Sequence, residues 1–169
     1  MPGPEQSLPQ DQDVRRLEVV GVRVELPSNQ PLVMLKEAEG NRYLPIWIGA
    51  TEALAIAAVQ QGLVTERPLT HALFRDVLAA LGVPVTKVVI TAMQNGVYYA
   101  TLVLGDLEVS ARPSDAIALA LRTDSPVYGA VSLLDDVGFE VAEEGEAQES
   151  EVERFREFLD TITPEDFEA

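Results

Sequence analysis

The sequence predicts an α+β fold in which an antiparallel or mixed sheet, with a three-stranded meander, packs against three to four helices, followed by a C-terminal amphipathic helix. Segments that alternate like strands are followed by segments with helical periodicity and then by more strands, without the regular βαβ repeat of a parallel sheet. The chain has 169 residues, of which 47% are hydrophobic, and this is enough for one domain with a core of its own.

The first strands are expected in residues 15–49. Hydrophobic residues alternate along residues 15–26, and their phase shifts at Gly21, which predicts a strand with a bulge at that glycine. Residues 31–49 have the pattern of two further strands, and residues 39–41 supply the turn between them.

Two helices are expected to follow, in residues 51–62 and 65–82, because apolar residues recur there at helical spacing. Each of these segments ends at a glycine, which suits the position just after a helix. Thr70 is the expected N-cap of the second helix. The apolar residues of this second helix form one stripe, made of Leu73, Phe74, Val77, Leu78 and Leu81.

The three-stranded antiparallel meander is expected in residues 85–112. Its strands are joined by tight turns at Asn95-Gly96 and Gly105-Asp106, and the first of these is the favoured two-residue hairpin turn because both positions accept positive φ. Together these turns fix the order of the three strands.

A third helix is expected from Pro113 to about Arg122, since proline fits the first turn of a helix and Asp115 there complements the helix dipole. A short strand over residues 125–131 and a short helix that ends at Gly138 complete the predicted domain.

Composition divides the chain into three parts. Residues 1–13 are rich in proline, glutamine and aspartate and are expected to be disordered, residues 14–141 form the domain, and residues 142–169 hold an acidic linker and an amphipathic helix. The apolar face of this last helix consists of Val152, Phe155, Phe158, Leu159 and Ile162.

The composition excludes several kinds of site. The chain has no cysteine, which rules out disulfides, thiolate metal sites and cysteine nucleophiles, and its one histidine, His71, cannot form a multi-histidine zinc site within one subunit. A metal would therefore be a hard cation such as Mg²⁺ or Mn²⁺ held by carboxylates. Phosphate-binding loop and dinucleotide motifs are missing, so no organic cofactor is expected.

The charge is strongly negative and unevenly distributed. The formal net charge is −16, and residues 140–169 hold twelve of the 28 acidic residues but two of the 12 basic ones. The rest of the chain has no basic stripe, which counts against tight, sequence-independent binding of nucleic acid. No apolar segment is long enough to cross a bilayer and no signal-like segment starts the chain, so we expect a soluble, cytoplasmic protein without a membrane partner.

Polar residues surround the ends of the third predicted helix. Arg112, Ser114, Asp115 and Arg122 fit a core helix with solvated ends, and they also fit a site for an anion. In the second interpretation Arg112 and the backbone at Ser114 hold the anion, and Asp115 serves as a base or a cation ligand. An arginine just before a helix N-terminus opposes the dipole, which favours a bound anion or a paired carboxylate.

Three residues of the two preceding segments could join such a site. Glu52 either stabilises the first turn of its helix or converges with Asp115 on one divalent cation. His71 is either a polar residue at a helix start or a general acid–base group. Arg67 either binds phosphate or is solvated.

Four segments of the chain, LPIWIGATEALAIA, RPLTHALFRDVLAALG, VVITAMQNGVYYATLVL and VSARPSDAIALALRTDSPVY, resemble the bifunctional nuclease domain family in their order and spacing. The resemblance covers roughly residues 17–141, and the family is common in bacteria and also occurs in plants. It implies an α+β domain that self-associates and a nuclease that acts on RNA and DNA. The family positions that map onto this chain are Glu52, Thr70, His71, Arg112, Pro113, Ser114, Asp115 and Arg122.

Many relatives carry an additional UvrB/UvrC-like helical motif at the C-terminus, and here the acidic tail stands in its place.

The leading hypothesis is a phosphodiester hydrolase in which Asp115 and Glu52 bind the cation or activate water and His71 transfers a proton. In a rival hypothesis the chain is a non-enzymatic module that recognises an anion or a protein partner, with the tail docking a basic partner or inhibiting the protein's own site. In a third, Arg112 and Asp115 pair across the symmetry axis of a homo-oligomer.

Overall fold

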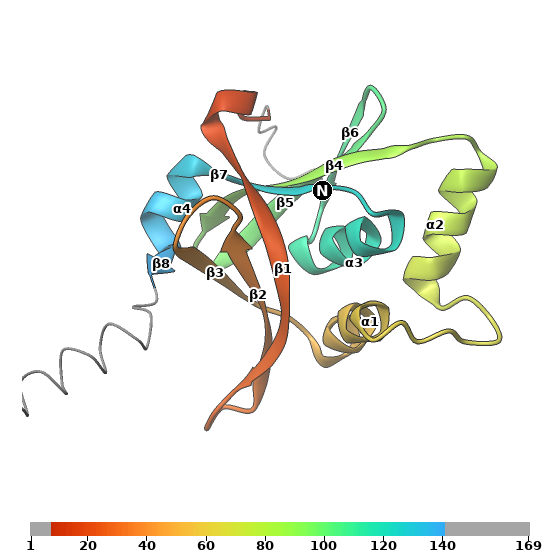
Figure 1. The fold of residues 1–169 in the computed structure, drawn as a ribbon, viewed down its shortest axis with the longest axis horizontal. Helices are drawn as coiled ribbons and strands as arrows, with labels where there is room; N and C mark the ends of the chain where they lie inside the picture. Colours follow the sequence, from red (N-terminus) through yellow and green to blue (C-terminus); the bar gives the residue numbers. More distant parts are fainter. Residues whose placement is uncertain (1–7, 141–169) are drawn as a thin grey trace, which may run out of the picture. The chain divides into compact units, whose positions relative to one another are not determined.

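In a computed structural model, residues 8–140 are described, and they form a mixed sheet of eight strands with four α-helices (Figure 1). The strands are β1 (Val14–Glu25), β2 (Gln30–Glu37), β3 (Arg42–Trp47), β4 (Val85–Gln94), β5 (Val97–Leu104), β6 (Leu107–Ala111), β7 (Val127–Ala130) and β8 (Phe139–Glu140). The helices are α1 (Ala50–Gln60), α2 (Thr70–Ala80), α3 (Pro113–Thr123) and α4 (Val131–Val137), and a short 3-10 helix, η1 (Asp11–Asp13), precedes β1. The predicted α+β class is confirmed, while the predicted C-terminal amphipathic helix lies outside the described residues.

The strands follow the order β6-β5-β4-β7-β1-β2-β3-β8 across the sheet. β4 and β7 run parallel, whereas β1 pairs antiparallel with β2 and β7, β2 with β3, and β5 with β4 and β6. The meander β4-β5-β6 is therefore confirmed, and its first turn has positive φ at both Asn95 (52°) and Gly96 (79°). The expected bulge is also present, as the β1–β2 register shifts between Val19 and Gly21.

The sheet is strongly curved. The hydroxyl of Tyr98 on β5 donates a hydrogen bond to the carbonyl oxygen of Pro45 on β3 (3.0 Å), although β4, β7, β1 and β2 separate these two strands in the sheet. Helix α4 likewise contacts both β3 and β4. Curvature brings distant strands together, so one core collects side chains from both halves of the sheet.

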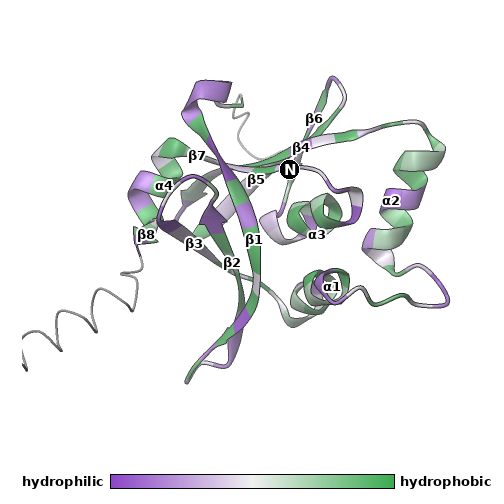
Figure 2. Ribbon diagram, viewed as in Figure 1, coloured by the Kyte–Doolittle hydropathy of each residue, from purple (hydrophilic) through white to green (hydrophobic). Residues whose placement is uncertain are grey.

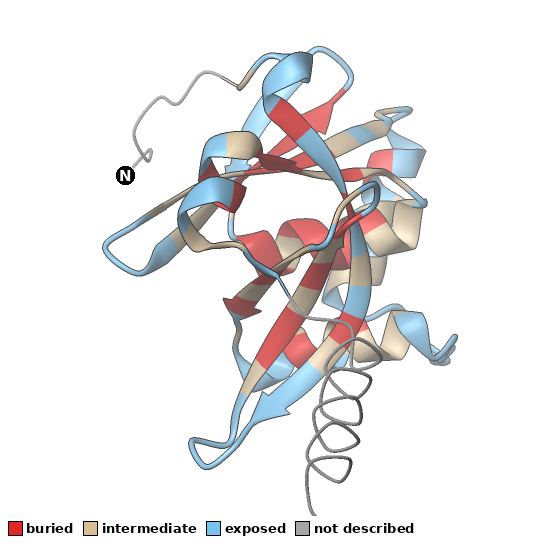
Figure 3. Cartoon of the chain, turned by 60° about the vertical axis from the view of Figure 1, so that its left-hand side comes forward, coloured by how far each residue is buried: buried red, intermediate tan, exposed pale blue. Residues whose placement is uncertain are grey.

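Helix α3 lies at the centre of the helical layer. It packs against α1 and α2 on one side and against β4 and β5 on the other, and residues 116–120 are all buried (Figure 3). Because α3 touches both other helices, residues near its N-terminus can meet residues of α1 and α2. This central position builds the site described below.

The apolar stripe predicted on α2 does not face the core as a whole. Leu78 is buried, with 7% of its surface exposed, whereas the remaining members of the stripe are exposed: Leu73, Phe74, Val77 and Leu81. Hydrophobic residues thus remain on the surface of α2 and in the segment that precedes it (Figure 2). The helix also begins at Thr70 rather than after it, because Leu69 adopts the extended N-cap conformation and its carbonyl accepts the first helical hydrogen bond, from Leu73.

A buried carboxylate ties three strands to α4. Glu37 on β2 is 7% exposed, and Arg42 on β3 donates to both of its oxygens, at 2.9 and 3.2 Å. Arg42 also pairs with Asp135 on α4, and Arg15 on β1 lies 3.8 Å from Glu37. The hydrogen bond from Arg42 holds the pKa of Glu37 below its ordinary value, although burial alone would raise it.

We expect Glu37→Gln to lower the free energy of unfolding by about 1–3 kcal/mol at pH 7, because it removes a charged partner of Arg42. A folded pKa below the unfolded value of about 4.3 stabilises the fold fully above that value, and this contribution is lost as pH falls through the folded pKa. The stability of the wild type should therefore fall more steeply in acid than that of the variant.

Urea unfolding at pH 7 and pH 3.5 measures both effects. Glu39→Gln is the matched control, since Glu39 is exposed in the turn that follows β2. Parallel pH profiles for the wild type and Glu37→Gln would contradict the assignment of this carboxylate.

Candidate active site

Four polar side chains from three helices meet at the N-terminus of α3. Arg112 donates from Nε to Oδ2 of Asp115 (2.7 Å) and from Nη2 to Oε1 of Glu52 on α1 (3.0 Å). Nε2 of His71 on α2 lies 2.9 Å from Oδ1 of Asp115. The result is a continuous chain of hydrogen bonds, Glu52–Arg112–Asp115–His71, in which the structure brings together four residues selected from the sequence.

The start of α3 sets the geometry of Arg112 and Asp115. Arg112 is the N-cap residue with an extended backbone, and Pro113 opens the helix as predicted. Asp115 follows Arg112 by three residues, a spacing that places the two side chains next to each other on one helix face. They therefore pair within one chain, and this pairing needs no second subunit.

Gly49 leaves room for Glu52 at the start of α1. Gly49 is the N-cap residue of this helix, and a Cβ added to it would clash with the carboxylate of Glu52. Glu52 can thus fold back over the helix N-terminus while its other oxygen reaches Arg112. Its side chain is 17% exposed, against 65% for Arg112.

The cluster holds Asp115 in its ionised form at neutral pH. Partial burial would raise the pKa of Asp115, but the hydrogen bonds from Arg112 and His71 outweigh it and leave the pKa below its ordinary value. The pKa of Arg112 is raised, chiefly by its hydrogen bond to Asp115. When neutral His71 donates from Nε2 to this carboxylate, Nδ1 carries the lone pair and is the basic nitrogen.

Glu52 and Asp115 do converge, but they converge on Arg112. The guanidinium bonds one oxygen of each carboxylate, so it takes the place that a shared divalent cation would need. Among residues 8–140, moreover, no three histidine or acidic side chains are grouped so as to hold a metal ion. The residues in this arrangement do not fit a divalent cation shared by Glu52 and Asp115, which is the site that the sequence suggested.

The other predicted site residues lie outside this cluster. Ser114 is 6% exposed, and Arg67 is exposed in the segment between α1 and α2. Arg122 lies in the last turn of α3, where its Nε is buried without a hydrogen-bond partner in the described part of the chain. Burial and the charge of Arg75 both lower the pKa of Arg122. Sequence reasoning did not select Arg75, which lies on α2 and pairs with Asp76.

A pocket of about 370 Å³ opens beside the cluster. It is lined by Thr70, His71, Phe74, Leu102, Ala111, Arg112, Asp115, Ala116 and Leu119. Polar residues thus occur together with an apolar wall drawn from α2, α3, β5 and β6. The sequence offered one usable signal for that wall, since Phe74 follows His71 by about one helical turn.

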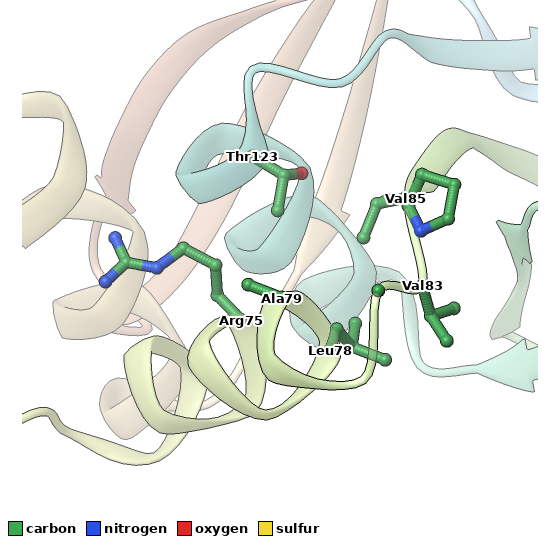
Figure 4. A pocket seen from close by; sticks show the side chains of 8 residues that line it. Arg75, Leu78, Ala79, Val83, Val85 and Thr123 are labelled. Carbon is green, nitrogen blue, oxygen red and sulfur yellow. The ribbon is translucent and has the colours of Figure 1, made fainter.

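A larger pocket, of about 530 Å³, lies near the C-terminal end of α2 (Figure 4). Arg75 is the one charged residue that lines it, and its guanidinium points away from Val83 and Val85. None of the residues predicted from the sequence to carry chemistry lines it. We therefore place the candidate site at the smaller pocket.

Comparison with known proteins supports the resemblance seen in the sequence. The profile of the family described as Bifunctional nuclease domain matches residues 33–142, which is more than half of the chain and includes the whole four-residue cluster. The chain belongs to the bifunctional nuclease domain family. Its cluster and pocket are therefore features of a bifunctional nuclease domain.

Two relatives from Mycobacterium tuberculosis match most of this chain. They are named Uncharacterized protein MT1877 and Uncharacterized protein Rv1829, and each is 49% identical over 160 residues, which cover 90% of this chain and 98% of the relative.

In the described range, none of the helices combines the length and apolar character needed to span a membrane.

If Arg112 occupies the place of a cation, its removal should create a weak cation site. We expect Arg112→Ala to bind Mn²⁺ about tenfold more tightly than the wild type, because Glu52 and Asp115 then lose their shared positive partner. Electron paramagnetic resonance of free Mn²⁺ measures this. Arg67→Ala is the control and should bind like the wild type, whereas wild-type binding as tight as that of Arg112→Ala would contradict the interpretation.

Proposed function

We propose that this bifunctional nuclease domain protein hydrolyses phosphodiester bonds of RNA or DNA, with His71 as the general base. The observation that carries the proposal is the hydrogen-bonded pair of His71 and Asp115 on the wall of a pocket that also presents Arg112. Membership in the family supports a nuclease-like activity. The arrangement supplies a base, a group that orients it and a cation for the phosphate, all within one chain.

In the proposed reaction, Nδ1 of neutral His71 takes a proton from a water molecule while the water oxygen attacks phosphorus. The bond from phosphorus to the leaving sugar oxygen breaks, and that oxygen receives a proton from the imidazolium or from solvent. Asp115 holds the imidazole ring in place and stabilises its charged form. No metal is given a role in this step.

Arg112 stabilises the negative charge that develops on the phosphoryl oxygens. Two of its nitrogens are bonded to Asp115 and Glu52, and Nη1 makes no hydrogen bond in the described part of the chain. The side chain is 65% exposed, so a phosphate can approach it from solvent. Glu52 acts through Arg112 and is a positioning residue.

We expect His71→Asn and Asp115→Asn to cut single-stranded RNA at least 100-fold more slowly than the wild type, the usual effect of losing a general base or its orienting group. Asp106→Asn, in the exposed turn between β5 and β6 and outside the four-residue cluster, is the carboxylate control. Cleavage rates are measured in EDTA and again with Mg²⁺ or Mn²⁺, because the sequence predicts a cation requirement whereas the proposed step uses no metal.

Equal cleavage by all four preparations would assign the activity to a contaminant. Cleavage that disappears in EDTA and returns with Mn²⁺ would replace the proposed base with a metal-bound water. Activity should also fall with added salt, since salt weakens the attraction between the exposed Arg112 guanidinium and the phosphate.

The alternative is a non-enzymatic module that recognises an anion or a protein partner. The net charge of −16 and the pairing of Arg112 with two carboxylates favour it. Self-association, a partner for the acidic tail and a cytoplasmic location stay predictions, as do the substrate-binding roles of Ser114, Arg67 and Arg122. Removal of residues 143–169 separates the two functions, since a chain that is inert with and without the tail favours the module.

A further inference from the structure

The pocket beside the cluster has two chemically different sides. His71, Arg112 and Asp115 supply charge and hydrogen-bonding groups, while the rest of the lining is mostly apolar: Phe74, Leu102, Ala111, Ala116 and Leu119. A water molecule and a phosphate need the first side. They leave the apolar side without a partner. A ligand that fills the whole pocket therefore also carries a flat apolar group, which contacts this side.

Phe74 is the aromatic member of this apolar side. It lies on α2 three residues after His71, so the two side chains share a helix face, and 44% of its surface is exposed. An exposed phenyl ring offers a flat surface on which another ring can stack. Two small residues, Ala111 and Ala116, leave the hollow next to it unfilled.

We propose that this pocket binds the nucleobase next to the cleaved phosphate, stacked on Phe74. This inference rests on the proposed function, and it names the part of the substrate that the catalytic residues do not touch. A nucleotide carries its phosphate and its base on one sugar, and the pocket presents Arg112 for the former and an apolar wall for the latter. Stacking tolerates every base, so the pocket selects a nucleotide without reading its sequence.

Such a pocket favours single strands. In a duplex the base is stacked and paired, and it must be turned out of the helix before it can enter a pocket, whereas an unpaired base enters without that cost. The absence of a basic stripe along the chain fits this preference, because stacking then supplies affinity that phosphate contacts do not.

The other exposed apolar residues of α2 separate this proposal from simple surface hydrophobicity. Leu73 and Val77 on the same helix, and Leu81 at its C-cap, are exposed but do not line the pocket. If the apolar surface of α2 served only to contact another protein, Val77 and Phe74 would be expected to behave alike. If the pocket binds a base, Phe74 alone of these side chains matters for it.

The experiment measures binding of a short single-stranded oligonucleotide to the full-length protein in EDTA. Its one base is 2-aminopurine, and all its other positions are abasic, because any other base could also stack in the pocket. The matched probe has an abasic residue in place of 2-aminopurine. Both probes carry a dye distant from this position, so fluorescence anisotropy measures the binding of each. We expect the base-bearing probe to bind the wild type about tenfold more tightly than the abasic probe, with quenching of the 2-aminopurine fluorescence. Phe74→Tyr should keep this ratio, and Phe74→Leu, which retains apolar bulk but no ring, should bring it close to one.

Val77→Ala is the control and should behave like the wild type. Equal binding of the two probes by the wild type, or equal loss in Val77→Ala and Phe74→Leu, would overturn the proposal. Because the readout is binding and needs no cleavage, a protein that holds the base-bearing probe as expected but never cuts it would sink the proposed function and leave the base pocket standing.

Discussion

The rest of the site depends on the two hydrogen bonds that the guanidinium of Arg112 donates to carboxylates. The guanidinium joins a carboxylate of α1 to a carboxylate of α3, and the second of these carboxylates in turn bonds His71 on α2. Polar groups thereby link α1, α2 and α3 at one point, in addition to the packing of α3 against α1 and against α2. The positive charge also helps to hold the pKa of Asp115 below its ordinary value, against the effect of partial burial.

Much of the fold could be read from local patterns. The hairpin at Asn95-Gly96, the start of α3 at Pro113 and the bulge at Gly21 each depend on a backbone preference of one or two residues, and each was predicted correctly. The apolar stripe of α2 was different. Periodicity shows that a helix has an apolar face but does not show whether the domain covers that face, and the exposure of Phe74 depends on how far α2 lies from the sheet.

The site shows the same division between local and long-range information. The sequence marked Glu52, His71, Arg112 and Asp115 because each lies near a helix start, where charge interacts with the backbone dipole. It could not show that Arg112 would lie between the two carboxylates, since that depends on how α1 packs against α3. The apolar wall of the pocket could not be predicted for a related reason. Leu102, Ala116 and Leu119 have the sequence pattern of ordinary core residues, and it takes the tertiary structure to show that a pocket lies beside them.

Substrate binding and proton transfer favour different charge states of His71. With a neutral imidazole the four side chains carry one positive and two negative charges, so an approaching phosphodiester meets a net negative group and gains only from direct contact with Arg112. A protonated imidazole would make the cluster neutral and favour the anion, yet it would have no lone pair with which to accept a proton. Binding of the substrate therefore gains from the form of His71 that cannot act as a base. Affinity supplied elsewhere in the pocket, away from the charged groups, relieves this conflict, because it holds the substrate without requiring the histidine to be charged.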